Sequence, residues 1–459
     1  MALLHSSYKQ LEEIVGKSNF IHNIEDRICY AYDATGQTYC PDAVIFPKNA
    51  TEIAEILTLA NEHDFYIIPR GSGTGMTGGS LAIKGGVVLA FSQMNRILKV
   101  DKDNLIAHVE PGVITGHLQA FVEDMGLFYP PDPSSSDIST IGGNVAECAG
   151  GPRAVKYGVT RDYVLGLEVV LPTGEIIQTG VQTKKGVVGY DLTRLFVGSE
   201  GTLGIITRII LKLIPKPEAV QTMLVVFDDV NTAAETVFAV RTLSITPRCI
   251  EFMDEASIQC ANQAVPLGLP AHVKALLIIQ VDGSPYQIDR DMERIQQLCY
   301  AKGALRVEVS NSSEDTERIW KARKAISPAL YMFGKDKINE DIVVPTNRIP
   351  DMIKKIDALR TASKLMMVCF GHAGDGNIHV NIMLNKDHSS ELEKAEKVIH
   401  EVFAYTLELG GTISGEHGIG ITKARYMPME IGKVELALMK KLKTLFDPKG
   451  ILNPGKLFL

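Results

Sequence analysis

The 459-residue sequence has only seven cysteines, and no two of them form a C-x-x-C pair. Such pairs are typical of zinc sites, iron–sulfur sites and haem attachment sites, so the chain by itself offers none of these. The odd count and the scattered positions also argue against a disulfide framework. We therefore expect reduced thiols, as in a cytoplasmic protein.

Long apolar runs are also missing. No stretch reaches the roughly 18 apolar residues that a membrane helix needs. The N-terminal stretch 1–17 mixes Lys9, Glu12 and Glu13 into its apolar residues, so it lacks the core of a signal peptide. We expect no direct membrane span and membrane association only through a partner. The formal net charge is −7, with no basic block, so nucleic acid is not an expected ligand.

What the chain does contain is an ordinary globular composition, with 45 % hydrophobic and 22 % charged residues. Its length predicts about two to three domains. At the proline-rich step Ile214-Pro-Lys-Pro the pattern of expected elements changes, and longer helices alternate with strands beyond it. This step predicts a domain boundary. We expect an α+β protein with an N-terminal helical segment, two α+β domains, and a C-terminal helix and tail; these cover 1–36, 37–215, 216–425 and 426–459.

Local patterns predict individual elements. The first thirty-odd residues read as helix, and 51–61 reads as a helix with Thr51 as its N-cap. Strands are expected at 43–46, 65–68, 86–91, 105–109, 164–171, 222–227 and 275–281. Further helices are expected at 233–245, 285–299, 317–329 and 434–445.

The segment 69–80 is a glycine-rich loop in which five of twelve residues are glycine. Gly73, Gly75 and Gly78 match G-x-G-x-x-G, but a Rossmann site needs a helix directly after the loop. Residues 81–86 end in two glycines and lead into an expected strand, so no helix fits there. Successive glycines can still turn backbone N–H groups toward a diphosphate, and Arg70 can add charge. The alternative is a plain surface turn.

Two later segments have the same character, 131–162 and 198–207. Both are rich in glycine and hydroxyl side chains, and both adjoin expected strands. Together with the first loop, in this order, they resemble the flavin-binding domain of vanillyl-alcohol oxidase-type (PCMH-type) flavoproteins. From 40 to 458 the chain resembles the group formed by the glycolate oxidase flavoprotein subunit and D-lactate dehydrogenases.

The resemblance implies that 37–215 binds FAD, that 216–425 binds substrate and metal, and that 426–459 returns to the flavin region. No histidine lies between His63 and His108, so we expect FAD to be held without a covalent bond. The residues that the resemblance assigns to FAD are Arg70, Gly71, Ser72, Gly73, Thr74, Gly75, Thr77, Pro131, Asp132, Ser135, Gly142, Asn144, Gly150, Tyr157, Gly158, Glu200, Ile206 and Asn453.

A cluster of histidines and carboxylates follows late in the chain. His372 and His379 lie seven residues apart around a glycine turn, and Glu416 and His417 lie in a second glycine-rich loop. Two imidazoles and one carboxylate can occupy three corners around a divalent metal and leave positions open for substrate. The alternative is that these are ordinary loop histidines. The resemblance assigns His372, His379 and Glu416 to a metal, with zinc expected and manganese or iron open, and His417 to the catalytic base.

A carboxylate substrate needs a counter-charge, and the resemblance assigns this role to Arg323 on the expected helix 317–329. A solvated helix face is the alternative. Asn381 shares a strand face with His379 and can hydrogen-bond the substrate. Relatives that bind a dicarboxylate carry a lysine near the position of Asn339. The asparagine here favours D-lactate or glycolate over the alternative, a D-2-hydroxyglutarate-type dehydrogenase.

The expected reaction moves a hydride from the substrate carbon to flavin N5 and a proton to His417. Electrons would then pass to a protein partner, either an iron–sulfur subunit or an electron-transferring flavoprotein, or to a quinone-linked chain. A homodimer is left open. Three rival interpretations remain: a free-standing oxidase, a metal-dependent hydrolase, and a non-catalytic electron-relay flavoprotein subunit.

Overall fold

The structure is a computed structural model that describes residues 5–270 and 272–458. The chain divides into two compact units, each built from separate stretches of sequence. Unit 1 comprises Met1–Gly150, Val159–Lys216 and Glu416–Leu459, and unit 2 comprises Gly151–Gly158 and Pro217–Gly415.

Unit 1 contains a four-stranded sheet in the order β1-β2-β4-β3. Its strands are β1 (Phe20–Ile21), β2 (Ala43–Ile45), β4 (Val87–Ala90) and β3 (Ile67–Arg70). The last three are parallel. Helices α1 (His5–Val15) and α3 (Ala50–His63) pack against this sheet through a buried cluster that includes Leu11, Ile56 and Val87. The glycine-rich loop leads into β4 without a helix, as predicted.

Two helices of this region, α1 and α3, differ from the prediction at one end. Helix α1 ends at Val15 because Gly16 has a φ of 83°, a left-handed conformation that favours glycine and ends helices. The N-cap of α3 is Asn49 and not Thr51. The Asn49 side chain accepts a hydrogen bond of 2.9 Å from the Glu52 backbone N–H, and asparagine is among the preferred N-cap residues.

The second sheet of unit 1 has five antiparallel strands in the order β5-β6-β10-β8-β9. They are β5 (Ile97–Asp101), β6 (Ile106–Val109), β10 (Ile205–Lys212), β8 (Val164–Val170) and β9 (Ile176–Gly180). Shorter elements of the unit are α2 (Ile24–Arg27), α4 (Thr115–Glu123), β7 (Leu127–Phe128), α5 (Ile141–Glu147), α7 (Leu192–Phe196) and β11 (Ile214–Pro215).

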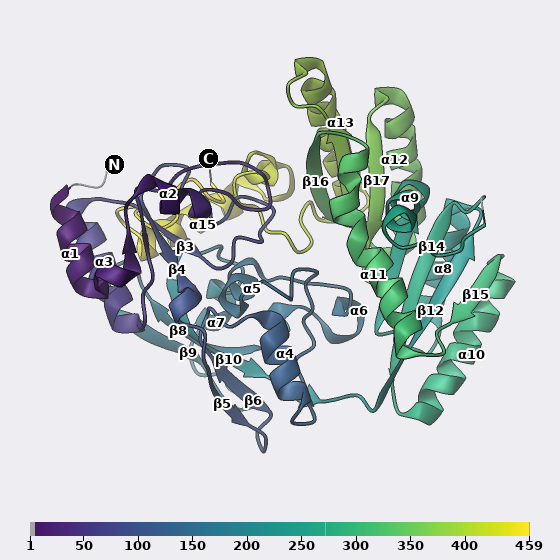
Figure 1. Cartoon of the computed structure of the whole chain (residues 1–459), viewed down its shortest axis with the longest axis horizontal. Helices are drawn as coiled ribbons and strands as arrows, with labels where there is room; N and C mark the ends of the chain where they lie inside the picture. Colours follow the sequence, from purple (N-terminus) through teal and green to yellow (C-terminus); the bar gives the residue numbers. More distant parts are fainter. Residues whose placement is uncertain (1–4, 271, 459) are drawn as a thin grey trace. The chain divides into compact units, whose positions relative to one another are not determined.

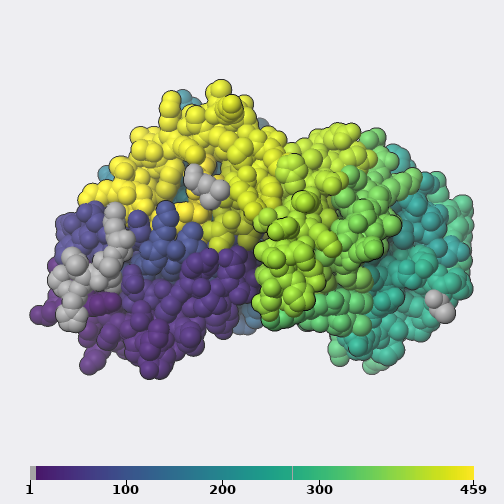
Figure 2. Space-filling view, turned by 90° about the horizontal axis from the view of Figure 1, so that it is seen from above, coloured from purple at the N-terminus to yellow at the C-terminus, as the bar shows by residue number. Residues whose placement is uncertain are grey.

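The C-terminal part of the chain completes unit 1. It contains α14 (Met427–Glu430) and α15 (Lys433–Phe446). Leu452 then pairs with Ile67 of β3, and Lys449 forms a 3.0 Å ion pair with Asp64. The yellow C-terminal residues accordingly lie beside the purple N-terminal ones at the surface (Figure 2). The first sheet of unit 1 thus includes contacts from both ends of the described chain.

Unit 2 is built on a seven-stranded sheet in the order β15-β12-β14-β13-β17-β18-β16. The strands are β12 (Ala219–Phe227), β13 (Cys249–Asp254), β14 (Ala275–Gly283), β15 (Arg306–Val309), β16 (Asp336–Val343), β17 (Met366–Gly371) and β18 (Asn377–Leu384). Every neighbouring pair is antiparallel. The segment 151–158, which contains α6 (Ala154–Tyr157), belongs to this unit as well.

Helices cover both faces of this sheet (Figure 1). One face carries α8 (Val230–Thr242), α10 (Pro285–Ala301), α12 (Ile349–Ser363) and α13 (Ser389–Glu408), and the other carries α9 (Glu255–Ala264) and α11 (Ser313–Ala329). The predicted helices are present, although α8 begins at Val230 because Asp229 caps it. None of the described helices has the length and apolar content needed to cross a bilayer.

The sheet face under α9 and α11 changes from apolar to polar along the strands. Phe370 of β17 and Met383 of β18 belong to the hydrophobic cluster beneath these helices. Alternate residues of a strand share one face, so Asn381 and His379 continue the row that begins at Met383. The buried apolar surface therefore gives way to buried polar groups at the same face of the sheet.

Candidate active site

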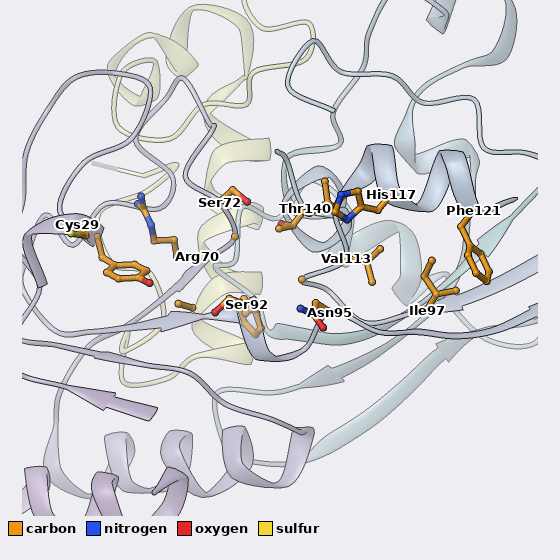
Figure 3. A pocket seen from close by; sticks show the side chains of 16 residues that line it. Cys29, Arg70, Ser72, Ser92, Asn95, Ile97, Val113, His117, Phe121 and Thr140 are labelled. Atoms are coloured by element: carbon orange, nitrogen blue, oxygen red, sulfur yellow. The ribbon is translucent and has the colours of Figure 1, made fainter. Parts of the chain in front are cut away.

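A cavity of about 710 Å³ lies within unit 1. Its walls come from the end of β3 with the start of the glycine-rich loop, from the residues after β4, and from the first turn of α4 (Figure 3). Its polar lining includes Arg70, Ser72, Asn95, His117 and Thr140. This volume lies in the usual range of small-molecule and cofactor sites, roughly 300–1,000 Å³.

Glycines bring the backbone unusually close at the walls of this cavity. A Cβ on Gly71 would lie 2.3 Å from the Thr140 Oγ1, and a Cβ on Gly112 would lie 2.1 Å from the Phe91 carbonyl oxygen. Both distances are far below van der Waals contact. Only glycine fits at these positions, so the cavity can present backbone groups to a ligand without side-chain obstruction. This wall suits the phosphate and nucleotide parts of a dinucleotide.

Arg70 is buried at the edge of this cavity and is held by the chain itself. Its Nη2 donates to the Tyr32 carbonyl oxygen at 2.7 Å, and its Nη1 donates to the Ser80 Oγ at 3.1 Å. Burial lowers the pKa of the Arg70 guanidinium, although Asp33 opposes that shift. A guanidinium in these surroundings keeps positive charge next to the glycine-rich loop.

The cavity includes only part of the predicted flavin-binding set. Arg70, Gly71 and Ser72 line it, whereas the other predicted residues lie outside its lining. Lining segments that were not predicted from the sequence include Phe91–Asn95 after β4 and Gly112–Ile114 between β6 and α4. The Pro111-Gly112 turn directly after a strand was a signal that could have found the second.

Three of the predicted flavin residues contribute to the support of the loop that carries Glu416 and His417. Glu200 accepts hydrogen bonds of 2.7 Å from the backbone N–H groups of residues 419 and 420. The Thr77 Oγ1 donates to the His417 carbonyl oxygen at 3.1 Å, and the Asn453 Nδ2 donates to the Glu200 carbonyl oxygen at 2.7 Å. Within unit 1 these contacts fix the backbone around the predicted base.

A second carboxylate lies beside this loop. A Cβ on Gly418 would meet Glu147 Oε2 at 2.1 Å and Glu200 Oε1 at 3.0 Å, so both carboxyl groups approach the same backbone position. Burial raises the pKa of the Glu147 carboxyl well above its usual value, and the neighbouring Glu200 raises it further. Burial also lowers the pKa of the nearby Lys456 to about 8. Unit 1 therefore keeps two acidic side chains, Glu147 and the buried Glu200, next to the loop.

Glu416 and His417 begin the last stretch of unit 1. A Cβ on Gly150 would lie 2.7 Å from Glu416 Oε2, so this glycine leaves room for the carboxylate. The His417 Nε2 lies 3.9 Å from the Glu416 Oε1. The preceding residue, Gly415, belongs to unit 2, where its backbone N–H donates to Asp341 Oδ2 at 2.9 Å.

Tyr157 and Gly158, also predicted to bind flavin, belong to unit 2. The Tyr157 hydroxyl donates to Asp282 Oδ2 at 2.7 Å, and Arg248 Nη1 donates to the same oxygen at 2.8 Å. Lys156 also pairs with Asp282. This buried carboxylate therefore fastens the segment 151–158 to β14.

The remaining predicted site residues of unit 2 come together on the face of the sheet under α11. His372 follows β17, is almost fully buried, and has its Nδ1 2.7 Å from Glu251 Oε1. The rings of His372 and His379 lie at right angles with centroids 5.2 Å apart. On the paired strand, Asp341 Oδ1 lies 3.5 Å from His379 Nδ1. Two imidazoles and a carboxylate thus meet in one buried group, of the donor types that bind a divalent metal.

Arg323 of α11 is buried in the same cluster, not on a solvated helix face. Its Nε and Nη2 donate to Glu251 Oε2 at 2.8 and 2.6 Å. The guanidinium carbon lies 4.7 Å from the centroid of the Phe370 ring. Burial alone would raise the pKa of the Glu251 carboxyl, but His372 and Arg323 hold it below its ordinary value.

Asn381 is fully buried and pairs with Asn339 across β18 and β16. The Asn339 Nδ2 donates to Asn381 Oδ1 at 2.7 Å. Two residues earlier on the same face of β16 lies Lys337, whose Nζ donates to Ser327 Oγ at 3.2 Å and whose pKa is lowered by burial. A lysine is therefore present in this row, although not at the position of Asn339.

Comparisons with known proteins agree with this description. Residues 41–180 match the family model described as "FAD binding domain", and residues 216–457 match "FAD linked oxidases, C-terminal domain". The chain is 47 % identical over 451 residues to "Glycolate oxidase subunit GlcD" of Bacillus subtilis, covering 98 % of this chain and 96 % of that one. It is 37 % identical over 425 residues to "D-lactate dehydrogenase" of Anaerostipes hadrus, covering 91 % and 89 %.

Solved structures support the fold. p-Cresol methylhydroxylase superposes with a TM-score of 0.81 at 17 % identity, covering 98 % of this chain and 96 % of that one. 4-Ethylphenol oxidase from Gulosibacter chungangensis gives a TM-score of 0.78 at 19 % identity, covering 99 % and 96 %. The predicted α+β fold with a vanillyl-alcohol oxidase-type FAD-binding domain is confirmed. The chain belongs to the FAD-linked oxidases, in the group that contains glycolate oxidase subunit GlcD and D-lactate dehydrogenase.

Proposed function

We propose that this chain oxidises a small D-2-hydroxy acid, D-lactate or glycolate, to the 2-oxo acid. The observation that carries the proposal is the buried group of Arg323, His372 and His379 on one sheet face of unit 2. A cation and a metal-binding group side by side suit a substrate with a carboxylate and an adjacent hydroxyl. The names of the relatives, glycolate oxidase subunit and D-lactate dehydrogenase, support the same substrate class.

The residues of the FAD-binding domain fit a non-covalently held FAD. The glycine walls of the cavity admit its phosphates, and no histidine is available in the loop 69–80 for a covalent link. Bound FAD would supply the hydride acceptor. We expect the flavin to leave the protein on acid precipitation, and flavin that stays with the precipitate would contradict a non-covalent site.

We infer that a divalent cation, zinc with manganese or iron as alternatives, is held by His372, His379 and Glu416, the ligands that the resemblance to the family assigns. Asp341 joins this set because it lies beside His379. A cation held there would make the substrate hydroxyl more acidic. His417 accepts the proton of that hydroxyl at a ring nitrogen, Arg323 binds the carboxylate with its terminal N–H groups, and Asn381 orients the substrate by hydrogen bonding. Glu416 and His417 are consecutive, so one chain segment supplies both ligand and base.

We further propose that the electrons leave through a protein partner, an iron–sulfur subunit or an electron-transferring flavoprotein. Two relatives, from Bacillus subtilis and Escherichia coli, are named as subunits of glycolate oxidase. Substrate-reduced enzyme should therefore react slowly with oxygen and faster with an artificial dye. Reoxidation by air-saturated buffer at the steady-state turnover rate would instead favour a free-standing oxidase.

One observation favours a second candidate, a D-2-hydroxyglutarate-type dehydrogenase. Lys337 lies on the same face of β16 as Asn339 and Asp341, and burial has lowered its pKa. A partly desolvated lysine in this row is a candidate partner for a second substrate carboxylate. The substrate panel below separates the two candidates.

An anaerobic titration tests the proposal. Purified holoenzyme is mixed with D-lactate, glycolate, D-2-hydroxyglutarate and the L-enantiomers, and bleaching of the flavin absorbance is followed. We expect the small D-acids or glycolate to bleach the flavin fastest. Bleaching by D-2-hydroxyglutarate alone would make that acid the substrate, and no bleaching by any acid would favour a non-catalytic electron-relay subunit.

A further inference from the structure

Glu251, a residue without a role in the reaction as described so far, lies at the centre of the polar cluster in unit 2. It is on β13, and only 1 % of its side chain is exposed. One oxygen, Oε1, is 2.7 Å from His372 Nδ1. The other, Oε2, accepts from Arg323 Nε at 2.8 Å and from Nη2 at 2.6 Å. One buried carboxylate thus touches two residues with different proposed roles.

The first contact decides which nitrogen of His372 can bind a metal. An ionised carboxylate can only accept hydrogen bonds, so His372 Nδ1 must carry the hydrogen. In the neutral ring the lone pair is then on Nε2, and Nε2 becomes the ligand nitrogen. A carboxylate that orients a metal-binding histidine in this way also makes the ring a stronger ligand.

The second contact fixes the guanidinium of Arg323. Its Nε and Nη2 edge lies on Glu251, and Phe370 lies against the guanidinium at 4.7 Å. Nη1 is not among the nitrogens that Glu251 engages. Because the guanidinium is planar, holding one edge and one face sets the direction of the remaining N–H groups. That direction decides whether a substrate carboxylate can be bound.

We propose that Glu251 is a positioning residue that sets both the metal-binding nitrogen of His372 and the orientation of Arg323. Metal binding and recognition of the substrate carboxylate then depend on a single side chain. This inference rests on the proposed function, because it assigns Glu251 to the site that oxidises the hydroxy acid. A buried ion pair with only a structural role is the competing explanation.

The test compares Glu251→Gln and Glu251→Asp with a matched control, Asp254→Asn. Asp254 is a buried carboxylate on the same strand, but its partners are Arg360, Ser257 and the Cys369 N–H. Zn²⁺ affinity is measured on holoenzyme by competition with a chelator, together with FAD content, kcat and KM for D-lactate or glycolate. The acid used is the one that bleaches the wild-type flavin.

For Glu251→Gln we expect Zn²⁺ affinity about 10–100-fold weaker than in wild type, because a neutral amide no longer polarises the ring. Excess Zn²⁺ should restore kcat. KM should be higher than in wild type and should remain so with excess Zn²⁺, because Arg323 has lost its ionised hydrogen-bond partner. FAD content should equal that of Asp254→Asn. Glu251→Asp keeps the charge with a shorter reach, so its Zn²⁺ affinity should fall between wild type and Glu251→Gln.

The outcomes separate this inference from the proposed function. If wild type binds Zn²⁺ and oxidises the acid but Glu251→Gln matches Asp254→Asn in affinity and KM, Glu251 has no positioning role and the function stands. Wild-type enzyme that neither binds a metal nor oxidises any hydroxy acid overturns both. Should Glu251→Gln fail to retain FAD, Glu251→Asp decides: unchanged affinity and KM overturn the inference, and weakened values support it.

Discussion

The candidate sites of the two units are built from different materials. The cavity of unit 1 is shaped by backbone and small residues. A Cβ added to either of two glycines in its walls, Gly71 or Gly112, would lie 2.3 Å or less from a neighbouring oxygen atom. The cluster of unit 2 is made of charged and polar side chains that neutralise one another while buried. The first site should therefore be sensitive to added volume, and the second to lost charge or a lost donor.

The largest effects are expected when the proposed metal ligands are removed one at a time. His372→Ala, His379→Ala and Glu416→Ala should each lose bound metal and measurable turnover, because each deletes one of three proposed metal ligands. FAD should remain at wild-type stoichiometry, since the cavity of unit 1 is unchanged. Metal analysis checks the loss of the cation, and the flavin spectrum of each variant checks that FAD is retained. Wild-type metal content in a variant would remove that residue from the ligand set.

The next largest effect is expected at the proposed base. His417→Ala or His417→Asn should slow flavin reduction by about 10²–10⁴-fold, the usual cost of a lost general base. Flavin and metal content should be unchanged, which distinguishes this residue from the adjacent Glu416. Stopped-flow reduction by substrate is the measurement. Reduction at close to the wild-type rate would move the role of base to Asp375 or Asp341.

A purely steric change tests the other side of the comparison. Gly112→Ala places a Cβ 2.1 Å from the Phe91 carbonyl oxygen, and a backbone oxygen cannot rotate away. The expected cost is about 1–3 kcal/mol with weakened FAD binding. Gly116→Ala is the milder comparison, because its Cβ would be 3.2 Å from the Ser136 carbonyl oxygen, a tight contact that a small shift relieves. The temperature of flavin release reports both, and equal values would refute the steric account.

The smallest effect concerns pH. Burial raises the pKa of Glu147, so the folded state binds a proton that the unfolded state has lost above about pH 4.3. The contribution of this group to stability therefore falls as pH rises from there toward the raised pKa. Glu147→Gln removes the titration and should lose less stability between pH 5 and pH 8 than wild type. Thermal unfolding of both proteins at pH 5 and pH 8 measures the difference. An equal loss of stability in wild type and Glu147→Gln between the two pH values would count against the raised pKa.

The sequence predicted those parts of the site whose chemistry is local. Loops rich in glycine and the two short segments with His372, His379, Glu416 and His417 are visible because the relevant residues are close together in the chain. Glu251 was not found, since its partners are 72 and 121 residues away. A lone glutamate in an apolar strand has no local signal, and only the pairing of β13 with β17 brings it near His372.

The ends of elements were also predicted incompletely. The choice between Asn49 and Thr51 as N-cap depends on the exact residue at which the chain leaves β2, which periodicity does not resolve. The contacts of Glu200 and Asn453 were not predicted either. Their flavin-binding role stays a prediction, and their side chains also bind the backbone of distant residues within unit 1, which local sequence does not indicate.

Because each unit is built from separate stretches of the chain, the order of synthesis also affects the order in which the units can fold. Unit 1 begins first, but it needs contacts from the end of the chain, where Lys443 Nζ donates to the Thr202 carbonyl oxygen at 2.8 Å and Leu452 bridges Ile67. The stretch 217–415 is synthesised before those residues. The unit that starts first on the ribosome is therefore the last to be completed, and its exposed sheet edge must wait for nearly the whole chain.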